Sequence, residues 1–117
     1  MAFRFRKFRV YQEAKILHKE VTKVTNKFNR EYLYLADQLK RSSLSIVLNI
    51  AEGSSKQSDK DFNRYIAISL GSVDESLASL EIALDQKLVS QEQFKELEAK
   101  LESLSNQLGA FSKSLRS

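Results

Sequence analysis

The sequence predicts an all-α fold, an antiparallel up-down-up-down bundle of four helices. Proline is absent from the 117 residues and glycine occurs only three times, so few positions interrupt a helix. Apolar residues recur at steps of three and four along most of the chain, which is the spacing of one helix face. The expected helices span about 9–27, 34–53, 58–87 and 91–115. Together with an N-terminal arm of residues 1–8 they make up one domain, residues 1–117.

The first helix is predicted by an apolar line with alternating steps of four and three residues. Its members are Val10, Ala14, Leu17, Val21, Val24 and Phe28. Lys15, Lys19 and Lys23 recur every four residues on the outer face of this helix, as on many solvated helix surfaces. His18, the only histidine, lies among these lysines, and we expect it at the surface.

The second helix has more apolar surface than one bundle requires. One face holds Leu35, Leu39, Ile46 and Ile50, and the neighbouring face holds Leu44, Val47, Leu48 and Ala51. The apolar arc exceeds half of the circumference, whereas a bundle helix needs about a third. The excess predicts that this helix also packs against another subunit, and Gly53 is expected to cap its C-terminus.

Capping boxes predict the starts of the third and fourth helices. Ser58 is followed three residues later by Asp61, and Ser90 is followed by Gln93. The fourth helix then has the most regular heptad pattern of the chain. Its apolar positions are Phe94, Leu97, Leu101, Leu104, Leu108, Phe111 and Leu115.

A line of polar residues in the second helix predicts a hydrogen-bonded interior. Ser42 belongs to this line, and a matching line of small residues in the third helix comprises Ser69, Ser72, Ser76 and Ser79. The structural network that we expect consists of Gln38, Arg41, Ser45, Asn49, Glu52 and Glu75. Tight helix packing is favoured over a ligand site. Glu52 and Glu75 are the only candidates for acid and base chemistry, and no nucleophile accompanies them, so we expect no enzyme and no catalytic residues.

Composition excludes several other classes of protein. There is no cysteine, which excludes disulfides and thiolate metal sites, and a single histidine leaves no familiar metal-ligand set. We therefore expect no metal and no cofactor. The N-terminus lacks the apolar run of a signal peptide, and no stretch is long enough to span a membrane. These features predict a soluble, cytoplasmic protein.

Positive charge is concentrated in the first half of the chain. Residues 1–50 hold 11 Lys or Arg against 4 Asp or Glu, whereas residues 51–117 hold 8 against 11. In residues 3–9, Arg4, Arg6, Lys7 and Arg9 alternate with phenylalanines. This composition suits base stacking combined with phosphate contact, but it suits equally an arm that packs on the bundle while its arginines stay in solvent.

Several short motifs resemble the four-helix bundle family first noticed in intervening sequences of bacterial 23S ribosomal RNA genes. They are Gln38-Leu39-Lys40-Arg41, Ser45-Ile46, Asn49-Ile50-Ala51-Glu52-Gly53, Asp61-Phe62, and Ala67-Ile68-Ser69-Leu70-Gly71-Ser72 with Glu75. Two positions depart from the family pattern: Asn29 stands where proline is common, and Leu70 where a basic residue is common. The second departure removes one charge that would support nucleic-acid binding.

The resemblance implies a left-handed bundle that assembles into a ring, a homopentamer in known relatives. The family is also similar to the accessory variability determinant of diversity-generating retroelements, a basic barrel thought to bind nucleic acid and to partner a reverse transcriptase. No enzymatic activity is implied.

Residues and resemblance together predict a non-enzymatic oligomer that binds RNA or structured nucleic acid. The residues expected to contact phosphates are Arg4, Arg6, Lys7, Arg9, Lys15, Lys19 and Lys23. The alternative is a scaffold or adaptor whose surface docks another protein. In that case, nucleic acid has no role.

Overall fold

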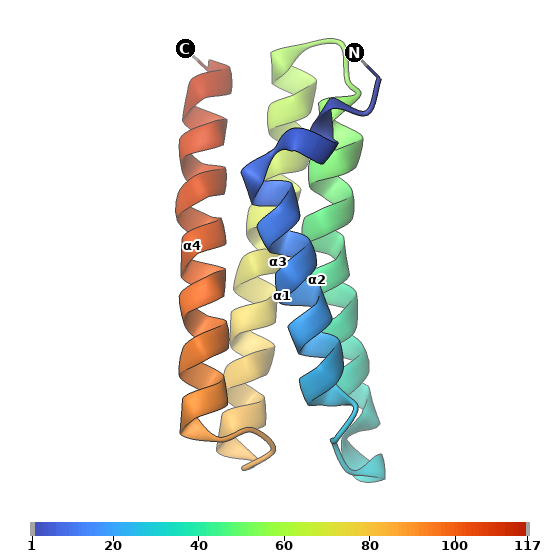
Figure 1. Cartoon of the computed structure of the whole chain (residues 1–117), viewed down its shortest axis with the longest axis vertical. Coiled ribbons are helices and arrows are strands. Elements are labelled where there is room, and N and C mark those ends of the chain that lie inside the picture. Colours follow the sequence, from blue (N-terminus) through green and yellow to red (C-terminus); the bar gives the residue numbers. More distant parts are fainter. Residues whose placement is uncertain (1, 117) are drawn as a thin grey trace.

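Four long helices lie side by side in the computed structural model, which describes residues 2–116 (Figure 1). The helices are α1 (Arg9–Thr25), α2 (Leu33–Ser54), α3 (Asp59–Asp85) and α4 (Gln91–Arg116), with short 3₁₀ turns η1 (Arg4–Lys7) and η2 (Arg30–Tyr32). The described residues form no strand and occupy about 44 × 22 × 20 Å. The prediction of an all-α fold with four helices is confirmed.

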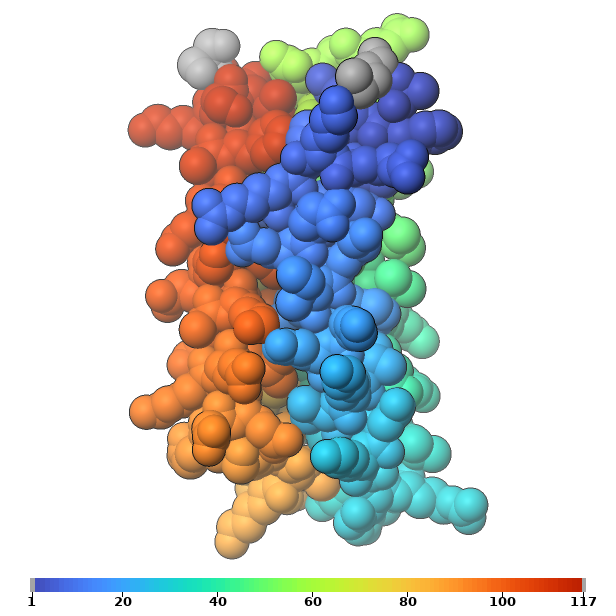
Figure 2. Space-filling view, viewed as in Figure 1, coloured from blue at the N-terminus to red at the C-terminus, as the bar shows by residue number. Residues whose placement is uncertain are grey.

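Both chain ends and the connection between α2 and α3 lie at the same end of the molecule (Figure 1). The connections from α1 to α2 and from α3 to α4 lie at the opposite end. We call the first of these the arm end and define it as residues 2–13, 52–64 and 110–116. Figure 2 shows the arm in dark blue beside the end of α4 in red.

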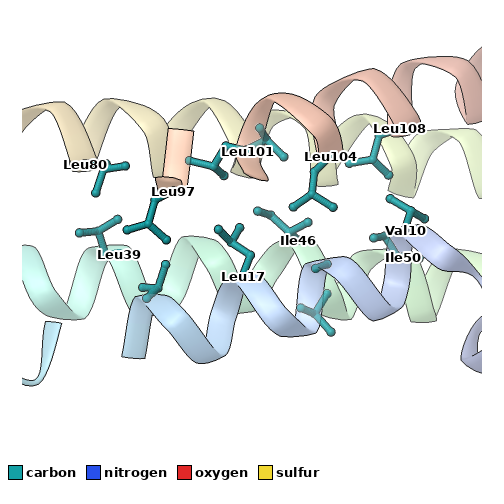
Figure 3. Packing of buried hydrophobic residues seen from close by; sticks show 14 of the residues in the cluster. Val10, Leu17, Leu39, Ile46, Ile50, Leu80, Leu97, Leu101, Leu104 and Leu108 are labelled. Carbon is teal, nitrogen blue, oxygen red and sulfur yellow. The ribbon is translucent and has the colours of Figure 1, made fainter. Parts of the chain in front are cut away.

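The core consists of apolar side chains that all four helices direct inward (Figure 3). Leu17, Ile46, Leu104 and Leu108 are almost completely buried at its centre. These are the positions that recur at helical spacing in the sequence, so burial follows the apolar stripe of each helix. No helix formed by the described residues is long and apolar enough to cross a membrane.

The helix starts follow the predicted caps. Ser90 and Gln93 form the full capping box, with hydrogen bonds of 2.9 and 3.0 Å in the two directions. Ser58 accepts from the amide of Asp61 at 3.1 Å, but the Asp61 carboxylate lies 3.7 Å from Arg64 instead of completing the box. The helix α1 ends at Thr25, two residues earlier than expected, because the chain tightens into i−3 hydrogen bonds that bring Phe28 into the core.

Gly53 does not cap α2 as expected. It lies inside the helix, which ends at Ser54, and none of the described glycines has a positive φ. A Cβ atom on Gly53 would lie 2.7 Å from Cβ of Tyr65 and 2.9 Å from Cδ1 of Phe62. The glycine is therefore required at this close approach of α2 and α3, because any side chain would collide with α3.

Candidate nucleic-acid interface

The arm folds back onto the bundle through a single 3₁₀ turn. The amide of Arg6 donates to the oxygen of Phe3 at 3.1 Å, and the amide of Phe8 donates to that of Phe5 at 3.0 Å. From α1, the side-chain amide of Gln12 donates to the main-chain oxygen of Arg6 at 2.8 Å. These bonds fix the positions from which the basic side chains of the arm leave the backbone.

Two of the four basic residues between positions 4 and 9 contact the bundle. Nε of Arg4 donates to the main-chain oxygen of Ser54 at 3.0 Å, and the guanidinium lies 5.3 Å from the ring centroid of Phe62. Arg4 thus lies at the C-terminus of α2, where unpaired carbonyls and the helix dipole favour a cation. Its partner is a main-chain atom, which leaves no pattern in the sequence.

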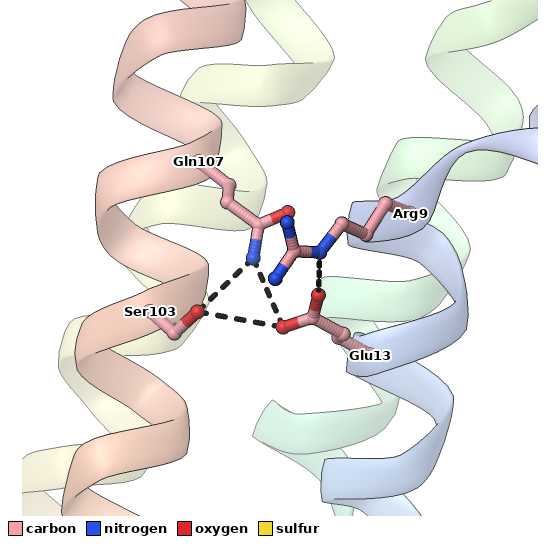
Figure 4. A network of polar contacts seen from close by, with 4 residues as sticks. All are labelled: Arg9, Glu13, Ser103 and Gln107. Carbon is pink, nitrogen blue, oxygen red and sulfur yellow. Dashed lines mark hydrogen bonds and ion pairs between the residues drawn. The ribbon is translucent and has the colours of Figure 1, made fainter.

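Arg9 belongs to a polar network between α1 and α4 (Figure 4). Its Nε donates to Glu13 Oε2 at 2.6 Å, and Glu13 Oε1 accepts from Gln107 at 3.0 Å and from Ser103 at 3.4 Å. The hydrogen bond from Arg9, helped by the other donors, holds the pKa of the Glu13 carboxyl below its ordinary value. The sequence analysis missed this network because Gln107 and Ser103 lie about 90 residues from Glu13 along the chain.

The remaining predicted phosphate contacts are exposed. Arg6 and Lys7 leave η1 toward solvent, and Lys15, Lys19 and Lys23 follow the outer face of α1. Nζ of Lys15 also lies 5.1 Å from the ring centroid of Tyr11. The seven predicted basic residues thus fall into two groups: Arg4 and Arg9, which are engaged with the bundle, and five that face solvent.

The fold gathers positive charge at one end of the molecule. The arm end contains nine Lys or Arg against four Asp or Glu, whereas the rest of the chain contains ten against eleven. The basic members are Arg4, Arg6, Lys7, Arg9, Lys56, Lys60, Arg64, Lys113 and Arg116. The arm end alone therefore has a net charge of +5, more than the +4 of the whole chain. Charge counted by halves of the sequence hides this pole, because three separate segments build it.

Two apolar hollows flank the arm. One, of about 460 Å³, lies between the start of α1 and the end of α4. It is lined by Phe8, Arg9, Val10, Gln107, Ala110, Phe111 and Ser114. The other, of about 310 Å³, is lined by Phe3, Phe5, Arg6 and Tyr11. Each combines aromatic rings with an arginine, a pairing that suits ligands with both an aromatic face and negative charge.

The serines of α2 and α3 meet along a buried seam. Ser76 donates to Ser42 at 2.8 Å, Ser72 donates to Ser45 at 2.9 Å, and Ser69 donates to the main-chain oxygen of Ile46 at 3.1 Å. Such short side chains let the two helices approach closely while their hydroxyl groups remain hydrogen-bonded.

The longer members of the predicted network lie outside this seam or at its edge. Asn49 donates to Ser45 at 3.0 Å, and Gln38 donates to Glu75 at 3.0 Å near the surface. Arg41 and Glu52 are exposed, as is Glu75, and no half-buried ion pair forms among these three residues. Their long side chains reach solvent from the outer edge of the helix face, which removes any need for a buried partner.

His18 is not a surface residue as expected. It is half-buried, and its Nδ1 lies 2.8 Å from the Oγ of Ser43 on α2. Burial lowers the pKa of His18 below its ordinary 6.5, because the charged form loses solvation. The described residues contain no group of three or more His, Asp or Glu side chains placed to hold a metal ion.

Comparison with known proteins agrees with the fold. A family model described as 23S rRNA-intervening sequence protein matches residues 6–110. A crystal structure of a protein of unknown function from the S23 ribosomal protein family of Bacteroides thetaiotaomicron is similar, with a TM-score of 0.84 at 21% identity. The match covers 89% of this chain and 98% of that one, and at this identity it shows the fold alone. No curated protein matches the chain.

Proposed function

The chain belongs to the 23S rRNA-intervening sequence protein family, and we propose that it is a non-enzymatic protein that binds RNA or structured nucleic acid through its arm end. The observation that carries this proposal is the net charge of +5 on the arm end, against a net charge of −1 on the rest of the chain. A charge pole of this kind attracts phosphates and releases their counterions on binding.

The basic residues that do not contact the bundle are the ones available for phosphate contacts. Arg6 and Lys7 supply the first phosphate contacts, since both are exposed and held in place by the hydrogen bonds of η1. Lys15, Lys19 and Lys23 extend the surface along α1. Arg4 and Arg9 mainly hold the arm and the α1–α4 seam, although the side chain of Arg9 remains 83% exposed and adds to the local charge.

Titration of a labelled RNA at 50 mM and 200 mM salt tests the proposal. Contacts to several phosphates predict a steep loss of affinity over this range. Absence of binding at low salt would contradict the proposal, and binding that is insensitive to salt would contradict the phosphate mechanism.

We infer in addition that the bundle is antiparallel and left-handed and that copies of it assemble into a ring, up to a homopentamer. Leu44, Leu48 and Ile68 support assembly, since they are 40%, 54% and 47% exposed on the outer surface of α2 and α3. The pairing of Ser42 with Ser76 and of Ser45 with Ser72 supports opposite directions for α2 and α3. Sedimentation that finds a stable monomer at micromolar concentration would contradict the assembly.

The same exposed apolar residues favour a second candidate function, that of a scaffold which docks another protein, such as a reverse transcriptase. A protein partner recovered from the native host and unaffected by nuclease would support this function. Loss of that partner on nuclease treatment would support nucleic-acid binding instead.

A further inference from the structure

The smaller of the two hollows beside the arm, of about 310 Å³, is lined by aromatic rings set nearly at right angles to one another. The rings of Phe3 and Phe5 lie 6.3 Å apart at 81°, and those of Phe5 and Tyr11 lie 4.9 Å apart at 72°. Arg6 completes the lining. Because the rings meet edge to face instead of stacking on one another, a ring face can remain open to a ligand.

Phe3 combines two features that are unfavourable for the isolated protein. Its φ of 61° and ψ of 37° lie in the left-handed region, which a bulky side chain rarely adopts. Its side chain is nevertheless 67% exposed, so burial does not compensate for the strain. Backbone strain at an exposed aromatic residue is typical of positions that contact ligands.

Charge decides which ligand class the hollow fits. Aromatic walls can bind a cation or stack on a nucleobase. Residues 2–12 contain four basic residues and no acidic one, and Lys15 already lies over the Tyr11 ring. A cationic ligand would be repelled, whereas a flat ring attached to a phosphate matches both the walls and their surroundings.

We propose that this hollow binds an unpaired base of a single-stranded nucleic acid, stacked on Phe3, with the adjoining phosphates on Arg6 and Lys7. This inference rests on the proposed function and narrows its ligand to unpaired nucleotides. Bases in the interior of a duplex are stacked on each other and expose only their edges, so only an unpaired or terminal base can place its face against Phe3.

Three probes of one length test the proposal: a single-stranded 12-nucleotide oligonucleotide, its duplex, and an abasic strand with the same number of phosphates. The test variant is Phe3→Asn, because asparagine tolerates the left-handed backbone and has no ring. The control is Tyr34→Asn, since Tyr34 is a similarly exposed ring, at 65%, in the first turn of α2, which begins at the end of the bundle opposite the arm. Thermal unfolding of both variants checks that they remain folded.

We expect Phe3→Asn to weaken binding of the single strand at least about fivefold and to leave binding of the abasic strand unchanged. Tyr34→Asn should change neither affinity. Equal affinity of the abasic and base-bearing strands, with no effect of Phe3→Asn, would overturn the stacking proposal while phosphate binding stands. Failure of all three probes to bind wild-type protein at low salt would instead overturn the proposed function, and this inference with it.

Discussion

Arg4 and Ser54 are joined by a hydrogen bond of 3.0 Å that ties the arm to the end of α2, 50 residues away in the sequence. The same guanidinium covers the ring of Phe62. Arg4 therefore stabilises the position of the arm, and its role differs from that of Arg6 and Lys7, which face solvent.

This difference predicts unequal effects on stability for two similar substitutions. Arg4→Gln should lower the free energy of unfolding by about 0.5–1.5 kcal/mol, since it removes a charge-assisted hydrogen bond to a helix C-terminus. It should also speed hydrogen exchange of the Phe8 amide, whose hydrogen bond to the main-chain oxygen of Phe5 closes η1. Arg6→Gln should stay within about 0.5 kcal/mol of wild type. Urea denaturation measures both, and equal stability of the two variants would contradict a structural role for Arg4.

The surroundings of Gly53 and Gly109 predict opposite changes in stability when either glycine is replaced by alanine. Gly53→Ala should destabilise the bundle by about 1–3 kcal/mol, because the new methyl group would overlap Tyr65 and Phe62. Gly109→Ala should stabilise it by up to about 1 kcal/mol, because Gly109 lies within α4 and nothing lies within 4 Å of an added Cβ. Thermal melts of the two variants compare them directly. A Gly53→Ala variant as stable as wild type would contradict this prediction, because it would show that α2 and α3 leave room for a methyl group at this position.

His18 predicts a loss of stability on mild acidification. Burial lowers its pKa in the folded state, so the unfolded chain takes up the proton more readily. Stability should therefore fall as the pH drops through and below about 6.5, and the loss should end below the lowered pKa of the folded state. Denaturation at pH 7.5 and 5.5 should show a larger loss for wild type than for His18→Gln, which does not titrate. Glu13 does not interfere, because its lowered pKa places its effect at more acidic pH. Equal losses in the two proteins would contradict this account.

Much of the fold follows from local sequence signals. The heptad of α4, the N-terminal caps at Ser58 and Ser90 and the absence of proline are short-range features that act within one helix. The serine seam was also predictable, because two lines of small residues at helical spacing have few arrangements other than facing each other. Gly53 was misassigned because a helix cap and a close helix contact both require glycine, and only the position of α3 distinguishes them.

The site was less predictable, because its parts come together only in three dimensions. The Arg4 contact ends on a main-chain oxygen, and the Glu13–Gln107 pair spans 94 residues, so neither has a sequence signature. His18 was placed at the surface from its lysine neighbours, but it lies on the side of α1 that meets Ser43. The arginine and phenylalanine alternation of the arm did indicate a concentration of positive charge there, although it could not separate anchoring residues from exposed ones.

Salt titration of two matched double variants tests the central claim most directly. Arg6→Gln/Lys7→Gln removes two exposed charges from the arm end. Arg30→Gln/Lys95→Gln removes two exposed charges from η2 and the start of α4, which lie at the opposite end (Figure 1). Net charge is therefore equal in the two proteins. We expect that only the arm variant binds single-stranded RNA more weakly, and that the negative slope of log K against log salt becomes less steep by about 1.4 for two lost phosphate contacts. Equal affinities and slopes for the two variants would contradict it, because binding would then not depend on the arm end.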